Sequence, residues 1–185
     1  MIYFCQNYDI LSKKPELLRY LPPERLKKLG KLKVVSDKNN SLIAWLLLSC
    51  ALKQPYLPDF SYHENGKPYF KELPTVDFSI SHCKTGVVCA VSDSPIGIDI
   101  QDIRSVDFKV MERVCSKTEL EFLLASDNRD YEFIKLWTLK ESILKQSGIG
   151  ISGNIKDAIE NCNLQTLPTK TYCYEKFIIS VCGKF

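Results

Sequence analysis

Histidine is scarce in this chain of 185 residues: only His63 and His82 occur, and its eight cysteines form no CxxC pair. A structural zinc site needs four nitrogen or sulfur ligands at short spacings, so we expect none. Both common glycine-rich phosphate loops, G-x-x-x-x-G-K-[ST] and G-x-G-x-x-G, are missing. The G-x-S-x-G elbow of serine hydrolases is missing too, which argues against that class of enzyme.

Long apolar runs are also missing. The longest, Leu42 to Leu52, is too short for a membrane span. The first residues, MIYFCQNYDILSKKPELLRY, show no basic segment followed by an apolar one. We therefore expect a cytoplasmic protein with no membrane association, whose cysteines are thiols despite their even number.

Charge is nearly balanced, because 25 basic residues face 22 acidic ones and the net charge is +3. This excess is too small for general adhesion to nucleic acid or membranes. One dense basic patch is opposed only by Glu24 and contains Arg19, Arg25, Lys27, Lys28, Lys31 and Lys33. It is either a solvated face or an anion site; a nucleic-acid binder is disfavoured because few aromatic side chains accompany the patch.

The sequence contains patterns typical of helices and others typical of strands, and together they agree with an α+β protein. A short helix is expected over 24–33, and a nearly all-apolar buried helix over 42–52, with its N-cap among residues 37–41. Ser116 followed by Glu119 is a capping box that opens another helix. A last helix is expected over 130–147, ended by Gly148.

Alternation of apolar and polar residues predicts strands over 76–81, 87–91 and 96–101, and a strand-rich tail over 171–185. The first strand should be half-buried and should form a hairpin with the second. Helices followed by a β pair thus occur twice, with a seam near residues 93–95. The pattern suggests two similar lobes, 1–94 and 95–185.

On the helix over 130–147, Lys140 falls in the middle of the apolar arc. Its ammonium must either emerge from the core or meet an anionic partner. Glu141 and Lys145 lie four apart at the edge of the arc, so both can address one site. A solvated ion pair of small energy is the alternative interpretation.

Asp99 lies on the polar side of its strand, away from the apolar face, where it is either a ligand for Mg²⁺ or an ordinary exposed aspartate. Ser81 and His82 end another strand. They are either an anion-binding pair or a polar turn.

Four short motifs, taken in their order along the chain, point to a known family. They are GKP at 66–68, FSISH at 78–82, PIGIDI at 95–100 and FIKLWTLKESILKQSGIGI at 133–151. Over about residues 25–151 the chain resembles the Sfp-type 4′-phosphopantetheinyl transferases, which share an SH pair, a G-[IV]-D strand and W-x-x-K-E-x-x-x-K. The resemblance implies the family's α+β fold, a pseudo-dimer of two similar lobes in one chain with the active site in the cleft between them. It also implies a monomer.

The activity implied is transfer of phosphopantetheine from coenzyme A to a serine of an apo acyl, peptidyl or aryl carrier protein. By the family pattern, Asp99 and Glu141 hold Mg²⁺, Glu141 is the candidate base, and Lys145 and His82 complete the catalytic group. The residues expected to bind or shape the coenzyme A site are Arg25, Lys28, Ser41, Lys67, Ser81, His82, Trp137, Lys140 and Lys145. The region 106–124, with Lys109, Arg113 and Lys117, is a candidate docking face for the carrier.

Gln101 departs from the family, which usually has an acidic residue as a metal ligand at this position. A neutral carbonyl oxygen predicts weaker Mg²⁺ binding. Asp102 cannot substitute, because it faces the other side of the strand. The departure motivates an alternative function, a coenzyme A or carrier-protein binding module with weakened catalysis.

Overall fold

The computed structural model describes residues 1–6, 9–148, 155–160, 162 and 167–185 of a mixed α and β protein. Elements of the first half are β1 Ile2–Gln6, α1 Ile10–Lys13, η1 Pro15–Tyr20, α2 Pro23–Lys31, α3 Val35–Leu52, β2 Ser61–Tyr62, β3 Pro68–Tyr69, β4 Asp77–His82 and β5 Gly86–Ser92. Those of the second half are β6 Ile96–Asp102, α4 Phe108–Val114, α5 Lys117–Leu124, α6 Arg129–Ser147, η2 Ile155–Asp157, β7 Thr169–Cys173 and β8 Phe177–Gly183.

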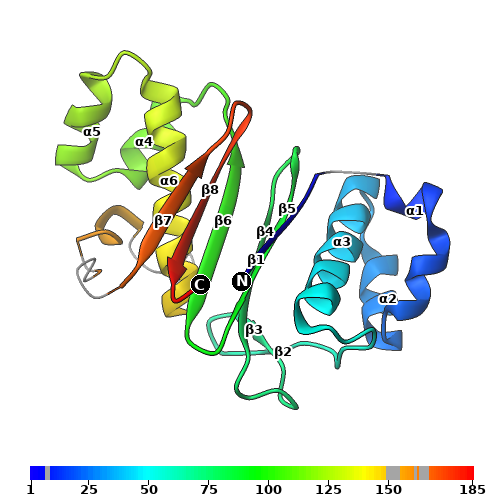
Figure 1. Ribbon diagram of the computed structural model, residues 1–185. Coiled ribbons are helices and arrows are strands. Elements are labelled where there is room, and N and C mark those ends of the chain that lie inside the picture. The colour runs from blue at the N-terminus through cyan, green and yellow to red at the C-terminus, as the bar shows by residue number, and fades with distance from the viewer. Residues whose placement is uncertain (7–8, 149–154, 161, 163–166) are drawn as a thin grey trace.

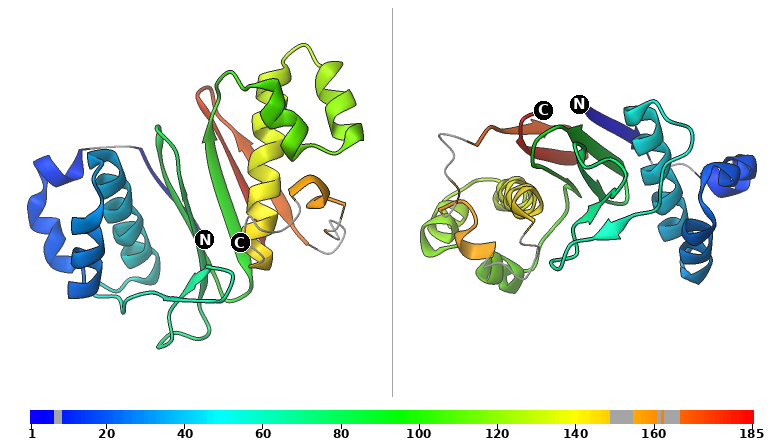
Figure 2. Two further views of the ribbon diagram at one scale, coloured as in Figure 1. Left: turned by 180° about the vertical axis from the view of Figure 1, so that it is seen from behind. Right: turned by 90° about the horizontal axis from the view of Figure 1, so that it is seen from below.

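Two three-stranded antiparallel sheets form the centre of the molecule (Figure 1). Their strand orders are β1-β5-β4 and β6-β8-β7, so in each the last strand along the chain lies in the middle. Helix α3 covers the outer side of the first sheet, with α1 and α2 packed beyond it, and α6 covers the outer side of the second, with α4 and α5 beyond it (Figure 2). Each half thus supplies one sheet and the helices that cover it.

The inner faces of the two sheets share a buried apolar cluster. It contains Val88 and Ala90 of β5 together with Ile96, Ile98 and Ile100 of β6. The opposite face of β6 lies against α6 so closely that a Cβ at Gly97 would overlap backbone atoms of that helix. Both faces of β6 are therefore buried, although the sequence alternates apolar and polar residues.

Polar side chains of β4 continue this packing. Asp77 Oδ2 accepts a hydrogen bond from the Ile96 backbone nitrogen at 2.7 Å, and Ser79 Oγ accepts one from the Ile98 nitrogen at 3.0 Å. β6 is an edge strand of its sheet among the described residues, and these two side chains satisfy backbone donors along its free edge. The expectation of a half-buried strand is wrong at Ser79, which is buried between the sheets.

The predicted helices are largely confirmed. The capping box joins Ser116 and Glu119 in both directions, and Gly148 ends α6 in the left-handed conformation. The predicted N-cap at 37–41 is wrong, because α3 begins at Val35 and residues 37–41 lie inside it. The hairpin of β4 and β5 is confirmed, whereas β1 had no prediction.

All eight cysteines are free, as expected. Burial raises the pKa of Cys89 to about 12. Among the described residues, we find no helix that combines the length and apolarity needed to cross a bilayer.

Candidate active site

Asp99 is the point at which three elements meet. Its carboxylate accepts hydrogen bonds from Lys145 Nζ of α6 and Ser81 Oγ of β4, both at 2.6 Å, and from Gln101 Nε2 at 3.2 Å. Only 2% of Asp99 is exposed, so the interpretation as an ordinary exposed aspartate is wrong. The polar side of β6 faces α6 rather than solvent, which explains the difference.

Glu141 lies one helical turn before Lys145 on α6 and is 7% exposed. Burial raises the pKa of its carboxyl group; the negative charge of Asp99 acts in the same direction, and the ammonium of Lys145 opposes both. A carboxyl with a raised pKa is a stronger base than an ordinary one, which suits proton transfer. Two carboxylates and one ammonium thus share a site that is largely withdrawn from water.

The donor atoms of this site fit a hard divalent cation. Asp99 and Glu141 offer carboxylate oxygens, and Gln101 carries an amide oxygen on the same strand as Asp99. Within the described ranges, no cluster of three or more His, Cys, Asp or Glu side chains could hold a metal. Two protein carboxylates completed by substrate oxygens and water is the arrangement typical of Mg²⁺.

Lys67 and Lys145 border a cavity of about 330 Å³ beside this site. Lys67 Nζ is held by Asp77 Oδ2 at 2.6 Å and by the Ile96 carbonyl oxygen at 3.2 Å. The cavity joins the GKP segment to the end of α6, and it is lined by Asn65, Gly66, Lys67, Pro68, Phe78, Ser79, Ile80, Leu144, Lys145 and Gly148. Two cations at the border of a mainly apolar cavity suit a ligand with an anionic end and an apolar part.

His82 ends β4, next to Ser81, and contacts helix α3. Its Nδ1 lies 3.3 Å from Nδ2 of Asn40. Partial burial, and after it the ammonium of Lys145, lower the pKa of His82, while the carboxylates of Asp37 and Asp99 act in the opposite direction. The ring is therefore poised to be neutral at physiological pH.

The predicted phosphate-binding residues of the first half lie close to α3. Arg25 Nη2 is 3.3 Å from Ser41 Oγ, and its guanidinium lies 4.6 Å from the centre of the Phe60 ring. Lys28 Nζ instead forms an ion pair with Asp59 Oδ2 at 3.1 Å. The structure thus brings Arg25 and Ser41 together, and it gives Lys28 an acidic partner.

Trp137 and Lys140 lie apart from this group. Trp137 packs edge-to-face on Phe133 in the apolar cluster of the second half. Lys140 is fully buried and donates to Glu119 Oε2 at 2.6 Å and to the carbonyl oxygens of Val114 and Lys156. The expectation that Lys140 must emerge or meet an anionic partner is confirmed by Glu119.

Sequence reasoning missed three residues of this region: Asp77, Asn40 and Asp59. Asp77 could have been found, because it occupies the first polar position of the alternating strand and directly follows the turn-rich segment. Asn40 and Asp59 have no local signal, since their partners lie 42 and 31 residues away.

The geometry can be compared with known proteins. The family model for the 4′-phosphopantetheinyl transferase superfamily matches residues 95–182, which contain Asp99, Glu141 and Lys145. The chain is similar to this superfamily over these residues. A relative named 4′-phosphopantetheinyl transferase Sfp, from Bacillus subtilis strain 168, is 36% identical over 143 residues, which is 73% of this chain and 63% of the relative.

Two further relatives show how far the likeness extends. The 4′-phosphopantetheinyl transferase gsp of Aneurinibacillus migulanus is 36% identical over 63% of this chain and 52% of its own length. The L-aminoadipate-semialdehyde dehydrogenase-phosphopantetheinyl transferase of Candida glabrata is 28% identical over 90% of this chain and 67% of its own length. The chain spans between about a half and two thirds of the bacterial relatives named here.

Proposed function

We propose that this protein transfers the 4′-phosphopantetheine group from coenzyme A to a serine hydroxyl of an apo acyl, peptidyl or aryl carrier protein, with release of adenosine 3′,5′-bisphosphate. The observation that carries the proposal is the contact of Asp99 with Lys145 and Ser81 next to buried Glu141. The likeness to the 4′-phosphopantetheinyl transferase superfamily supports the same reaction.

Attack on a pyrophosphate phosphorus depends chiefly on positioning and on neutralising charge. Glu141, whose pKa is raised, accepts the proton of the carrier serine, directly or through water. Lys145 has three N–H donors and gives one to Asp99, so others are available for the oxygens of the leaving group. Ser81 orients Asp99.

Asp99 and Glu141, with the amide oxygen of Gln101, would hold Mg²⁺, which would neutralise charge on the pyrophosphate. Gln101 supplies no negative charge and presently gives its N–H to Asp99, so we expect weak metal binding.

The rest of coenzyme A would occupy the cavity and the neighbouring basic side chains. Lys67 borders the adenine, and Ser81 and His82 reach the phosphates. Arg25, Lys28 and Ser41 bind the 3′-phosphate. Trp137 and Lys140 act on the site through the core that supports α6.

We also propose that the chain is a pseudo-dimer of two similar lobes, 1–94 and 95–185, with the active site in the cleft between them. The common strand order of the two sheets supports this, as does the bond between Ser81 and Asp99. With both lobes in one chain, a monomer suffices. The eight free cysteines suit the cytoplasm.

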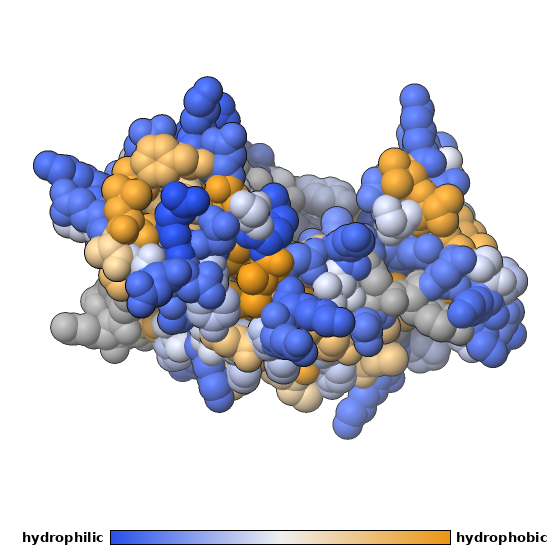
Figure 3. All heavy atoms as spheres, turned by 90° about the horizontal axis from the view of Figure 1, so that it is seen from above, coloured by the Kyte–Doolittle hydropathy of each residue, from blue (hydrophilic) through white to orange (hydrophobic). Residues whose placement is uncertain are grey.

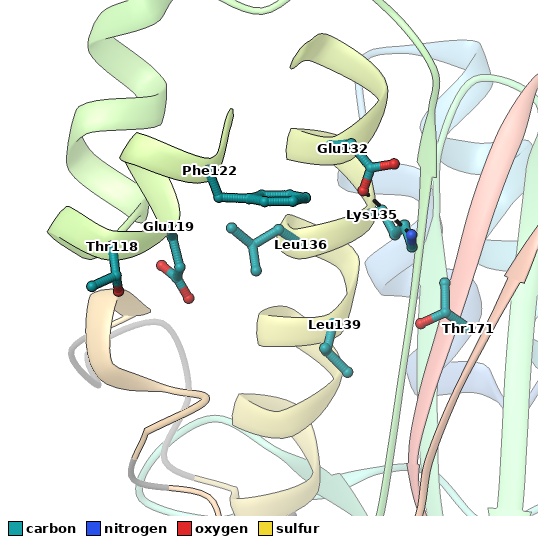
Figure 4. A pocket seen from close by; sticks show the side chains of 8 residues that line it. All are labelled: Thr118, Glu119, Phe122, Glu132, Lys135, Leu136, Leu139 and Thr171. Atoms are coloured by element: carbon teal, nitrogen blue, oxygen red, sulfur yellow. Dashed lines mark hydrogen bonds and ion pairs between the residues drawn. The ribbon is translucent and has the colours of Figure 1, made fainter. Parts of the chain in front are cut away.

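The carrier would dock on the face of residues 106–124. Apolar side chains gather at this end of the molecule, at the left of Figure 3, and Phe122 and Leu124 are more than half exposed. A groove of about 430 Å³ lies between α5 and α6, and in it Phe122 and Leu136 point toward one another (Figure 4). The proposed contacts to an acidic carrier come from Lys109, Arg113 and Lys117, which alternate on this face with Asp107, Glu112 and Glu121.

The test is the intact mass of a purified apo carrier protein after incubation with this protein, coenzyme A and Mg²⁺. A gain of one phosphopantetheine group that EDTA abolishes would establish the transferase. No gain with several unrelated carriers, despite measurable coenzyme A binding, would favour the alternative, a binding module with weakened catalysis that Gln101 suggests.

Glu141→Gln separates the two functions further. An enzyme would lose modification of the carrier and keep its affinity for coenzyme A within about an order of magnitude, since Glu141 acts on the reacting atoms. A binding module would show no modification with either form.

A further inference from the structure

Asn40 is an unusual residue for a helix interior, because its amide is buried and points across to another element. It lies in the second turn of α3 and is 6% exposed. Its Nδ2 is 3.3 Å from Nδ1 of His82, at the end of β4. Its Oδ1 has no hydrogen-bond partner in the described part of the chain. A buried amide with one unmet atom costs stability, so its placement calls for an explanation.

The contact determines which nitrogen of His82 carries the proton. A neutral imidazole has one N–H and one lone pair, and the hydrogen bond at one nitrogen fixes the state of the other. When the Asn40 amide donates to Nδ1, that nitrogen must be unprotonated. The proton then resides on Nε2, on the other side of the ring, in a residue that is exposed overall.

We propose that Asn40 is a positioning residue that holds His82 as the neutral Nε2–H tautomer and aims this N–H outward as a hydrogen-bond donor for an anion. The inference deepens the proposed function, on which it rests for the identity of that anion, a phosphate oxygen of coenzyme A. It assigns to α3 a second contribution to the site beside Ser41.

This arrangement has a chemical purpose. Burial, and after it the ammonium of Lys145, lower the pKa of His82, so the ring does not depend on a positive charge to attract phosphate. A neutral histidine helps only if its N–H faces the anion, and the wrong tautomer would present a lone pair and repel it. Asn40 removes the wrong tautomer without adding a charge to the site.

The test is long-range ¹H–¹⁵N NMR of the imidazole rings at a pH above their titration. The chain has only two histidines, so both rings can be assigned, and His63 serves as internal control. His63 directly follows β2 and stacks on Tyr69, with ring centres 4.3 Å apart. In the native protein we expect His82 with a protonated Nε2 and an unprotonated Nδ1. The opposite assignment, or an even mixture, would overturn the proposal.

The variant Asn40→Asp should reverse the tautomer of His82. An aspartate of the same shape can only accept, so the proton of His82 should move to Nδ1 while the His63 signals stay unchanged. An unchanged His82 tautomer in a folded variant would contradict the positioning role. If the variant does not fold, the native spectrum still decides the question.

Adding coenzyme A to the native protein separates this inference from the proposed function. A shift of the His82 Nε2 resonance, with the tautomer retained, supports both. The Nε2–H tautomer without any response to coenzyme A would leave the role of Asn40 intact and contradict the proposed ligand.

Discussion

Lys145 reaches from α6 to place its ammonium 2.6 Å from Oδ1 of Asp99, yet only one partner of this ion pair meets solvent: the Asp99 side chain is 2% exposed and that of Lys145 is 29% exposed. A buried carboxylate is costly unless it is paired and hydrogen-bonded. Lys145 therefore stabilises the fold as well as serving the proposed chemistry. The ion pair of Lys145 and Asp99 joins helix α6 to strand β6, the two elements that support the site.

Lys145→Met tests this double role. The variant leaves Asp99 with its bonds to Ser81 and Gln101 but without a cation, so we expect a loss of about 2–3 kcal/mol in the free energy of unfolding. Urea denaturation monitored by circular dichroism measures it. Lys135→Met is the matched control on the same helix, because Lys135 forms a half-exposed pair with Glu132 at 3.3 Å. The control should cost below about 1 kcal/mol, and equal losses would contradict the argument.

Lys140→Met should be more damaging to stability than to ligand binding. The fully buried ammonium satisfies Glu119 and two carbonyl oxygens, so its removal should cost about 3–5 kcal/mol. Glu119→Gln keeps an oxygen for the capping bond to Ser116 and should cost less. Denaturation compares the variants, and calorimetry checks that any folded fraction binds coenzyme A with nearly native affinity. A large change in affinity at native stability would place Lys140 at the ligand instead.

Local patterns were sufficient to predict most of the helices and strands. Helical period, the capping box and Gly148 each involve neighbours within a few residues, and the structure agrees with them. The N-cap of α3 was misplaced because asparagine and aspartate are common both at helix starts and in tertiary hydrogen bonds. Asn39 binds the Leu11 nitrogen of α1, so it serves another element rather than the start of its own helix.

The site could be predicted only in part from the residues. The spacing of Glu141 and Lys145 shows that they share one flank of a helix, and this needs no tertiary information. The bond between Asp99 and Lys145 spans 46 residues, and no local pattern contains it. Burial of Asp99 was missed for the same reason, because alternation reveals that a strand has two faces but not what covers the polar one.

Gln101→Glu should lower the stability of the metal-free protein and raise its affinity for Mg²⁺. In EDTA the new carboxylate faces Asp99 and removes the donor to its Oδ2, so the variant should lose about 1–2 kcal/mol. With Mg²⁺ the added charge should strengthen binding by about tenfold, which a larger metal-induced rise in Tm would reveal. Gln54→Glu carries the same charge change at an exposed position and should show neither effect. A variant that binds metal no better would show that position 101 is not a ligand.

Asp59→Asn should tighten binding of the 3′-phosphate, because it releases Lys28 from its ion pair. The Asp59 Oδ1 atom is buried and lacks a hydrogen-bond partner among the described residues, so the carboxylate is poorly satisfied where it stands. An exposed pair is worth up to about 1 kcal/mol, which corresponds to an affinity gain of up to about fivefold. Calorimetry with coenzyme A and with its analogue lacking the 3′-phosphate separates this local effect from the general gain in positive charge. If the effect is local, binding of coenzyme A tightens and binding of the analogue does not. The control is Asp127→Asn, at an exposed position distant from Lys28, which should alter neither affinity. If both ligands bound more tightly by the same factor, Lys28 would not contact the 3′-phosphate and Asp59 would act only through net charge.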